Sequence, residues 1–566
     1  MKMKNQVVKL LKPLLDLEED HILSLVETPP SREQGDLAFP CFQLAKQFRK
    51  SPALIAGELA DKLPTEELAA AGFAKAEAMG PYLNFFFDRG QLAKELLAST
   101  VADQLADYQI GAGKTVVVEY SSPNIAKHFK LYHIRSTMIG QALANTYAAL
   151  GYQVERMNHL GDWGTQFGKL LAAYFKWGND EKIKADPLSE LIHLYVKFHE
   201  EAEKDPSLEE EGRRWFKKLE DGDEQAVRLW QWFKDESLKE FEKIYRLLGV
   251  SFDHYLGESY YGEKMEKVLA ELEEKGLLEE SEGALIVRLE DKQIPPCIIK
   301  KSDGASIYAT RDIAAALYRY ERFNPEKILY VVDQRQSLHF QQVFGVLERM
   351  GYEFARRCHH IEFGVMKIEG EIGSTRKGKG VLLHEVLEQA IKKAEVIINE
   401  KNPSLANKKE VAKAVGIGAI VFNDLKQHRT REVNFKWDEA FNFEGKTGPY
   451  VQYTHARISS LLRRAGDLKI EPVTHAVYEQ PLTWEIIYTL YQYPSVLVET
   501  VKKDDPSQIA KYLLDLCQLF NRFYAEERIF VDDQNEQIAK LALCKKMALV
   551  LKHGLSMLTI EAPEEI

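Results

Sequence analysis

The chain has few cysteines and no long apolar run. Its five cysteines lie far apart, and no two of them form a Cys-x-x-Cys pair. A disulfide framework is therefore not expected, and the cytoplasm is the expected compartment. No stretch of about 18 apolar residues occurs, so no membrane-spanning helix is predicted. The first twenty residues mix lysines with acidic residues and lack an apolar segment, which argues against a secretory or transit peptide.

Metal-binding and common phosphate-binding motifs are also lacking. Cys358, His359 and His360 are adjacent, and adjacent side chains rarely point at one ion, so no metal site is predicted. Neither the Gly-x-Gly-x-x-Gly of dinucleotide sites nor a Gly-Lys-Ser/Thr loop occurs where a strand passes into a helix. The net charge of −11 argues against indiscriminate nucleic-acid binding, but it leaves room for a partner bound through local basic faces.

A chain of 566 residues is too long for one core, and its patterns divide it into three parts. Residues 1–112 begin with helical periodicity and end in a strand, which predicts a small α+β domain. Residues 113–440 alternate strands with helices and so predict a parallel sheet, with a charged, helical insertion at about 170–300. Residues 441–566 are almost purely helical and predict an all-α bundle.

One strand-to-helix turn concentrates positive charge. The buried strand VVVEY (116–120) leads into SPNIAKHFKLYHIRSTMIG (122–140), which carries Lys127, Lys130 and His133 before a helix. In a parallel sheet, such helix N-termini lie at the carboxyl edge and bind anions. The alternative is a solvated basic helix start with one capping histidine.

A second cationic loop, GSTRKGKG (373–380), lies between a strand-like segment and a helix. Its glycines permit movement, and its cations could close over a polyphosphate. Taken alone, a charged glycine loop is usually only solvated. Two such loops at strand ends of one sheet favour a nucleoside triphosphate as ligand.

Five motifs in order resemble those of class I aminoacyl-tRNA synthetases, and more narrowly of arginyl-tRNA synthetases. They are SPNIAK…HIRST, NHLGDWGTQFG (158–168), IYATRD (307–312), STRKG (374–378) and GPYVQYTHAR (448–457). The resemblance spans essentially the whole chain. It implies a Rossmann-type catalytic domain with an insertion, an N-terminal domain at the tRNA elbow and a helical anticodon-binding domain. It also implies that ATP, arriving with magnesium, activates arginine as an adenylate before transfer to tRNA(Arg), without an obligate protein partner.

The resemblance assigns roles around the phosphates. The residues implied for catalysis are Lys127, Lys130, His133, Ser374, Arg376 and Lys377. Those implied for binding ATP are Pro123, Lys127, His133, Gly161, Asp162 and Gln166. Thr375 stands where many class I enzymes carry the second lysine of their closing loop, which gives Lys127 more weight.

For the amino acid, a planar cation with five donors requires carboxylates and amide oxygens. The residues implied by resemblance are Glu119, Ser122, Asn124, Tyr308, Asp312 and Gln336. A carboxylate among β-branched residues is costly unless paired, so a cationic ligand would explain Glu119. The alternative for Asp312 is a charge that interacts only with the dipole of its own helix.

The resemblance also implies tRNA contacts and a role for the insertion. The implied contacts are Tyr82, Asn84, Tyr450, Arg457 and Tyr524. Tyr524 could stack on an anticodon base or could belong to the bundle core. A charged pocket discriminates well enough without hydrolytic editing, so the insertion is predicted to be structural or tRNA-positioning.

The sequence departs from the family signature at two positions. Lys130 replaces the first histidine, and Tyr132 replaces a glycine that lets adenine approach the backbone. A competing hypothesis is therefore a synthetase-like protein without activity that binds tRNA or an amino acid. The other retained motif residues weigh against it. A nucleotidyltransferase that makes a small nucleotide conjugate would not explain the two flanking tRNA-type domains.

Overall fold

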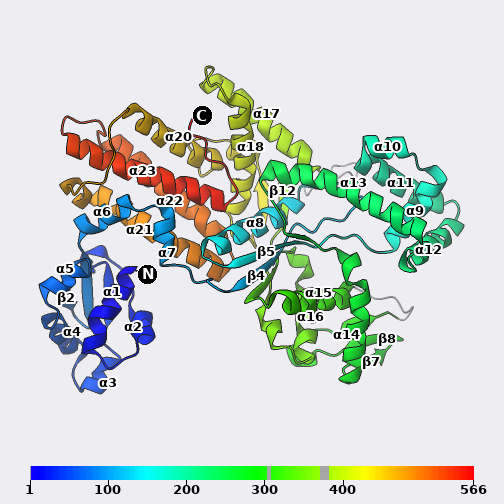
Figure 1. Cartoon of the computed structure of the whole chain (residues 1–566), viewed down its shortest axis with the longest axis horizontal. Coiled ribbons are helices and arrows are strands. Elements are labelled where there is room, and N and C mark those ends of the chain that lie inside the picture. Colours follow the sequence, from blue (N-terminus) through cyan, green and yellow to red (C-terminus); the bar gives the residue numbers. More distant parts are fainter. Residues whose placement is uncertain (1, 302–307, 370–380) are drawn as a thin grey trace.

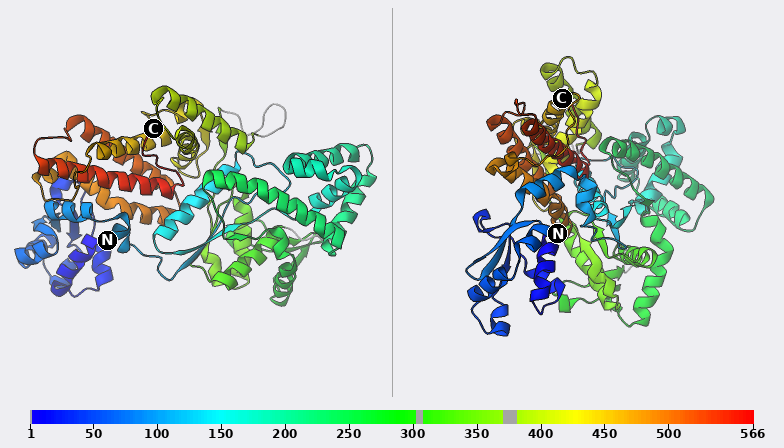
Figure 2. Two further views of the ribbon diagram at one scale, coloured as in Figure 1. Left: turned by 45° about the horizontal axis from the view of Figure 1, so that its top comes forward. Right: turned by 60° about the vertical axis from the view of Figure 1, so that its left-hand side comes forward.

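A computed structural model describes residues 2–301, 308–369 and 381–566. An N-terminal domain, a central sheet domain and a C-terminal helical region follow one another along the chain (Figure 1). The N-terminal domain lies beside the helical region at one end of the molecule, and the helices after β5 extend at the other (Figure 2). The predicted fold class, a multidomain α/β protein with a parallel-sheet domain and a helical C-terminal part, is confirmed.

The N-terminal domain packs helices on a three-stranded antiparallel sheet of order β1-β3-β2. Leu83, Phe85 and Phe87 alternate along β3 and are buried, as a half-covered strand requires. Two further helices lead from this domain to the central sheet. The elements are α1 (Lys2–Leu11), α2 (Glu19–Leu25), β1 (Leu37–Pro40), α3 (Leu44–Phe48), α4 (Pro52–Asp61), α5 (Thr65–Ala70), β2 (Phe73–Met79), β3 (Tyr82–Phe87), α6 (Arg89–Ala98) and α7 (Val101–Ala106).

The central domain is built on five parallel strands in the order β11-β10-β4-β5-β6. Val117 of β4 faces one core, and Val116 and Val118 face the other, so helices cover both faces. The chain runs outward from β4 to β6 and then returns to place β10 on the other side of β4. The strands and flanking helices are β4 (Thr115–Glu119), α8 (His133–Ala149), β5 (Gln153–Asn158), β6 (His254–Tyr255), α15 (Tyr308–Phe323), β10 (Lys327–Tyr330), α16 (Ser337–Arg349) and β11 (Cys358–His360).

The region predicted as one insertion at about 170–300 consists of three parts, which corrects that interpretation. A helical group from α9 to α13 comes first, β6 then pairs with β5 inside the parallel sheet, and a small antiparallel sheet follows. The elements are α9 (Thr165–Trp177), α10 (Asp180–Ala185), α11 (Pro187–Ala202), α12 (Ser207–Glu220), α13 (Glu224–Leu248), η3 (Glu258–Tyr261), α14 (Gly262–Glu274), β7 (Glu279–Ser281), β8 (Ala284–Val287) and β9 (Cys297–Lys300). A two-residue strand in a charged region gives no periodicity to detect.

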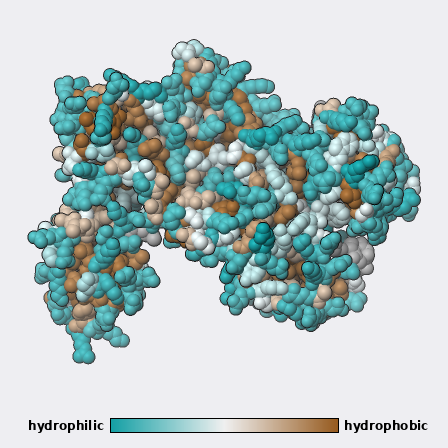
Figure 3. Space-filling view, viewed as in Figure 1, coloured by the Kyte–Doolittle hydropathy of each residue, from teal (hydrophilic) through white to brown (hydrophobic). Residues whose placement is uncertain are grey.

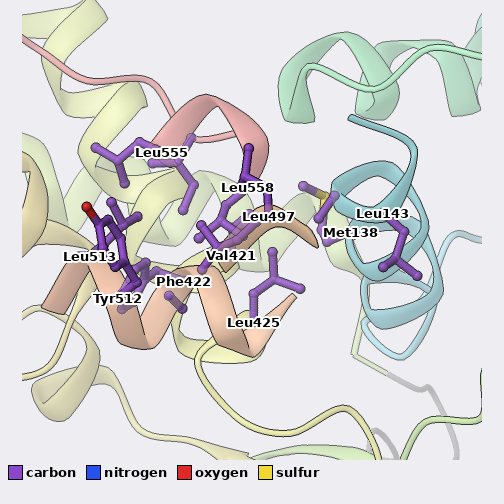
Figure 4. Packing of buried hydrophobic residues seen from close by; sticks show 14 of the residues in the cluster. Met138, Leu143, Val421, Phe422, Leu425, Leu497, Tyr512, Leu513, Leu555 and Leu558 are labelled. Carbon is purple, nitrogen blue, oxygen red and sulfur yellow. The ribbon is translucent and has the colours of Figure 1, made fainter. Parts of the chain in front are cut away.

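Long helices form the C-terminal region and continue into the hydrophobic core of the sheet domain. Met138 and Leu143 of α8 belong to the same buried cluster as Val421 and Leu425 of α18 and Leu497 of α21, and Figure 4 shows Met138 on the side of α8 that faces Leu497. This shared core fixes the helices relative to the sheet. The elements are β12 (Met366–Ile368), α17 (Leu383–Lys401), α18 (Lys408–Leu425), β13 (Val433–Phe435), α19 (Trp437–Ala440), α20 (Gly448–Arg464), α21 (Pro481–Lys503), α22 (Ser507–Glu526) and α23 (Gln534–Met557).

Hydrophilic residues cover most of the face shown in Figure 3, as expected for a domain surface that meets water. Among the described residues, no helix is both long and apolar enough to cross a bilayer.

A buried ion pair joins the sheet domain to the C-terminal helices. Arg135 on α8 donates from Nε to Asp424 Oδ1 on α18 at 2.7 Å, and both side chains are almost fully buried. Its Nη1 also donates to the carbonyls of Gly364 at 2.6 Å and Arg431 at 2.8 Å. One guanidinium thus ties four segments, and losing its partner would leave a buried charge unpaired.

We expect Asp424→Ala to lower the free energy of unfolding by about 3–5 kcal/mol, because Arg135 would keep its charge in a buried site. Urea denaturation followed by tryptophan fluorescence measures the change. Glu499→Ala is the control: it removes an exposed partner of Lys503 on α21 and should cost less than about 1 kcal/mol. Equal effects of the two substitutions would contradict the assignment.

Candidate active site

A tight loop joins β4 to α8 at the carboxyl edge of the sheet. Ser121 and Ser122 have φ angles of 71° and 48°, in the left-handed region that non-glycine residues rarely adopt. The hydroxyl of Ser136 accepts a hydrogen bond from the Ser121 amide at 2.9 Å and donates to the carbonyl of Val331 at 2.6 Å. The loop is therefore held in a strained shape between α8 and the end of β10, as functional loops often are.

The loop also approaches the segment after β5 very closely. The Gly161 amide donates to the Pro123 carbonyl at 3.1 Å, and the Ile125 amide donates to the Gly161 carbonyl at 3.2 Å. A Cβ atom at position 161 would lie 1.9 Å from Asn124 Oδ1. Glycine is required here because the Asn124 side chain occupies that space.

His133 is the first residue of α8, and its ring is fixed by the backbone. His133 Nδ1 lies 2.9 Å from the Lys130 amide nitrogen and 3.2 Å from the Lys130 carbonyl oxygen, and the shorter contact, in which the amide donates, favours the neutral tautomer with its proton on Nε2. Burial lowers the pKa of His133 to about 4, and the nearby Lys130 charge acts in the same direction. The ring also contacts Phe129 and Tyr132. His133 is thus a neutral hydrogen-bond donor at the N-terminus of a long helix.

A cleft of about 550 Å³ opens at the carboxyl ends of β4 and β10. Strand order reverses between these two strands, and open α/β sheets bind ligands at such points. The sequence-predicted residues in its wall are Glu119, Ser122, Asn124, His133, Gly161, Tyr308, Asp312 and Gln336. The structure therefore gathers residues from three of the five motifs, together with Glu119 and Gln336, into one cavity.

Three carboxylates of the cleft are each paired with a basic side chain. Arg319 Nη2 lies 2.5 Å from Glu119 Oε2, and Arg311 Nη1 lies 3.1 Å from Glu258 Oε2. The third, Asp312, has its Oδ2 2.5 Å from Nε2 of a histidine on α16, His339. The cleft is acidic, but its charges are already held in place by the protein.

The pKa values of two of these carboxyls differ in direction. Burial raises the pKa of Glu258 to about 7, although the Arg311 guanidinium opposes this. Burial also acts to raise the pKa of Asp312, but the hydrogen bond and charge of His339 outweigh it, so this pKa lies below its usual value. A cationic ligand would favour the ionised form of both.

Glu119 has its counter-ion inside the protein, contrary to the expectation from the sequence. Its carboxylate was expected to need a cationic ligand because it lies in an apolar strand, but Arg319 already supplies the opposite charge. The distance of 200 residues between the two hid this pair. Glu119 remains in the cleft wall.

Several predicted residues lie outside the cleft wall. Asp162 is buried beneath it and accepts hydrogen bonds from Lys234 Nζ at 2.6 Å and from the Ser259 amide at 2.8 Å, so it ties α13 to η3 and is not available to ATP. Further residues outside the wall are Pro123, Lys127, Lys130 and Gln166. Ser374, Arg376 and Lys377 lie outside the described residues.

The sequence did not point to five acidic, basic or histidine residues of the cleft wall. They are His159, Glu258, Asp333, Arg335 and His339, and Asp333 pairs with Arg335 at 2.8 Å. His159 lies within the NHLGDWG motif and could have been noticed there. Glu258 was concealed in the predicted insertion, and Arg335 and His339 follow β10 without any distinctive spacing.

The two predicted tRNA contacts of the N-terminal domain differ in accessibility. Tyr82 is partly exposed, and its ring meets the exposed Phe42 edge to face at 5.5 Å. Asn84 is only 3% exposed, in the middle of β3. The prediction that the Asn84 side chain contacts tRNA is therefore wrong, because this side chain is buried within the sheet.

In the C-terminal region, the predicted contacts gather around a basic groove. Tyr524 is 43% exposed, so the alternative of a bundle-core tyrosine is wrong. The Arg457 guanidinium lies over the rings of Tyr453 and Tyr524 at 5.0 and 5.3 Å. Asn521 links Arg457 to the Tyr450 hydroxyl by hydrogen bonds of 3.3 and 2.9 Å. The groove of about 470 Å³ also has Arg463 and Arg464 in its wall.

Three family models together match nearly the whole chain. The model described as tRNA synthetases class I (R), catalytic domain, matches residues 95–437. The chain belongs to the arginyl-tRNA synthetase family. The family's Arginyl tRNA synthetase N terminal domain matches residues 1–87, and the DALR anticodon binding domain matches residues 451–566.

Relatives within the family cover almost all of the chain. An arginine–tRNA ligase of Exiguobacterium sp. is 50% identical over 97% of both chains, and one of Alkaliphilus metalliredigens is 48% identical over 100% of this chain and 99% of its own. The solved arginyl-tRNA synthetase of Thermus thermophilus is 28% identical, with a TM-score of 0.79 over 100% of this chain and 99% of its own. That of Plasmodium falciparum, at 23% identity and a TM-score of 0.77, shares the fold. The resemblance found in the sequence is confirmed.

We expect the His133 ring to stay neutral down to about pH 4. Because its folded pKa lies below its ordinary value, the unfolded state takes up the proton first, so the contribution of this ring to stability falls as pH drops from about 6.5 to about 4. Histidine-selective ¹³C NMR measures the titration, and His133→Gln identifies the signal. A His133 signal that titrates near pH 6.5 would contradict the assignment.

Proposed function

We propose that the chain ligates L-arginine to tRNA(Arg) through an arginyl-adenylate, with ATP as a substrate, in the cytoplasm. One observation carries the proposal: the acidic cleft and the N-terminus of α8, with His133 as its first residue, meet at one point of the sheet. The acidic side suits a guanidinium, and the neutral donor at the helix N-terminus suits a phosphate. The family to which the chain belongs supports the same activity.

The reaction has two steps. In the first, an arginine carboxylate oxygen attacks the α-phosphate of ATP and pyrophosphate leaves. In the second, a ribose hydroxyl at the end of tRNA attacks the arginyl carbonyl and AMP leaves. In-line displacement at phosphorus depends on positioning and charge neutralisation more than on covalent help. Magnesium carried in with ATP would share that neutralisation.

The arginine subsite is proposed at the paired carboxylates. Asp312, Glu119 and Glu258 converge on the cleft from α15, β4 and η3. Their opposite charges inside the protein keep them in fixed orientations, so an entering guanidinium finds acceptors that need no rearrangement. A neutral side chain of similar size would lack donors for the carboxylate oxygens that their internal partners leave unpaired, which is costly in a buried site.

The phosphate subsite is proposed at the start of α8. His133 would donate from Nε2 to a phosphate oxygen, and the dipole of α8 would favour the negative charge there, although the amides of His133 and Ile134 already donate to the carbonyls of Lys130 and Leu131. Lys127 and Lys130 are close in sequence and could neutralise charge nearby. The predicted loop residues Ser374, Arg376 and Lys377 stay part of the proposal by resemblance.

The tRNA is proposed to bind through the groove around Arg457 and Tyr524 and through Tyr82 of the N-terminal domain. A half-exposed ring beside a guanidinium is a suitable platform for an unstacked base. Both domains match family models whose descriptions name tRNA or an anticodon.

An impaired paralogue that only binds its ligands is not supported by the comparisons. The full-length relatives are named arginine–tRNA ligases, and the cleft keeps the predicted arginine-binding residues. Tyr132, which replaces a glycine of the family signature, is 47% exposed in the cleft wall with its ring tilted against His133. Its side chain does not fill the cavity.

The activity is tested with purified protein, labelled arginine, ATP and total tRNA, scored for acid-precipitable label. Label that depends on both ATP and tRNA supports the proposal. Binding of arginine without any transfer to tRNA would instead support the alternative of an inactive, ligand-binding synthetase-like protein.

We expect Asp312→Asn to lower kcat/KM for arginine by the equivalent of about 2–4 kcal/mol, because one charged acceptor of the guanidinium is lost. Steady-state aminoacylation measures the change, and the KM for ATP should barely move. Asp291→Asn is the control, since Asp291 is exposed, lies outside the cleft wall and pairs with Arg349. An unchanged arginine kcat/KM in folded Asp312→Asn would refute the assignment.

We expect Tyr524→Ala to raise the KM for tRNA by the equivalent of about 1–3 kcal/mol, because a base would lose its stacking surface. Tyr524→Phe keeps the ring and should stay near the wild-type value. The KM for ATP should be unaffected in both variants. Normal tRNA kinetics in Tyr524→Ala would show that no base stacks there.

A further inference from the structure

The helix α15 supplies charge to the cleft from two directions. Tyr308 and Asp312 lie one turn apart on it and line the cavity. Arg319 follows seven residues after Asp312 and therefore lies on the same side of the helix. Its guanidinium points beneath the cavity to the end of β4, where it meets Glu119. One helix face thus contributes both a cleft residue and the internal counter-ion of another.

Arg319 is fully enclosed by protein. Its side chain is 0% exposed, and the ring of Tyr330 lies 5.2 Å from the guanidinium. The hydroxyls of Tyr261 and Tyr330 lie in the same region and are also buried. Burial raises the pKa of both tyrosines, so they are neutral near pH 7. Arg319 therefore supplies the full positive charge that faces Glu119 from the surrounding elements.

A carboxylate at the position of Glu119 would be costly to bury without a counter-ion. The residue is 5% exposed, and burial without a counter-ion shifts a carboxyl toward its neutral form. A neutral carboxyl would attract a cationic substrate far less. The ion pair occupies Oε2 and leaves Glu119 in the cleft wall.

We propose that Arg319 is a positioning residue for the amino-acid substrate: it holds Glu119 ionised and oriented beneath the cleft without touching the substrate itself. This role rests on the proposed binding of arginine in the cleft. It differs from a purely structural ion pair because it acts through the charge state of one cleft residue. An arginine side chain of the protein thus prepares the site for the arginine substrate.

The test compares Arg319→Met, which removes the charge at similar volume, with Arg319→Lys, which keeps it. Arg319→Met should lower kcat/KM for arginine about tenfold or more near pH 7, with little change in the KM for ATP. Arg319→Lys should recover most of the loss. Arg322→Met, on the exposed face near the end of α15, is the control and should match the wild type.

The pH profile separates positioning from packing. Without Arg319, the buried Glu119 carboxylate loses its counter-ion, so the ratio of variant to wild-type kcat/KM should be smallest at about pH 6 and recover toward about pH 8.5. Taking the ratio cancels groups that titrate alike in both proteins, among them Glu258, whereas the Arg319 charge also acts on Asp312 and lowers its pKa. A ratio that stays constant with pH, or no rescue by lysine, would overturn the proposal.

A double-mutant cycle with Glu119→Gln guards against misfolding, because Arg319→Met and Glu119→Gln together leave no buried charge unpaired. If Arg319 acts through Glu119, adding Arg319→Met to Glu119→Gln should change arginine kcat/KM by less than about threefold. Additive losses would overturn the proposal. Arginine affinity measured by calorimetry gives the same comparison independently of aminoacylation. If the wild-type protein bound arginine but did not charge tRNA, that result would refute the proposed function and would leave the proposal for Arg319 testable by arginine binding.

Discussion

The burial of carboxylates around the cleft is the constraint on which the architecture of this site depends. Water no longer solvates these groups well, so each needs an internal partner with an opposite charge or a strong donor. The partners come from α15 and α16, which follow β9 and β10 and pack against the sheet. The order β11-β10-β4 brings those helices under the end of β4. Charge pairing and strand order are thus two aspects of one arrangement.

The burial of charged groups also explains why the cleft has an acidic side and, opposite it, a side that begins with a neutral residue. The acidic side of the cleft is built from residues with internal counter-ions, and the opposite side begins with a neutral histidine at the N-terminus of α8. A protonated His133 would attract the carboxylates as well as a phosphate. Because burial keeps the ring neutral, it offers a donor that does not compete with the guanidinium for the acidic side.

Sequence patterns predicted the parts of this structure that depend on local rules. The apolar run before Glu119, the helix after His133 and the long C-terminal helices follow from periodicity and were found where expected. The motif residues Tyr308, Asp312 and Asn124 also reached the cleft. The pairs between distant segments could not be predicted, since nothing local marks Arg319 as the partner of Glu119. Asp162 was misassigned for the same reason, because its partners lie in the region thought to be an insertion.

In that region, the helical insertion determines part of the shape of the cleft. The chain leaves the sheet after β5, forms five helices and returns through β6, after which Glu258 enters the cleft wall. Asp162 fixes this return, because it binds Lys234 of the last insertion helix and Ser259 next to Glu258. A Cβ at Gly257 would collide with the Asp162 carboxylate. The insertion therefore sets the position of an acidic residue in the cleft, and the geometry of the amino-acid site extends through Asp162 into helices that contain none of its wall.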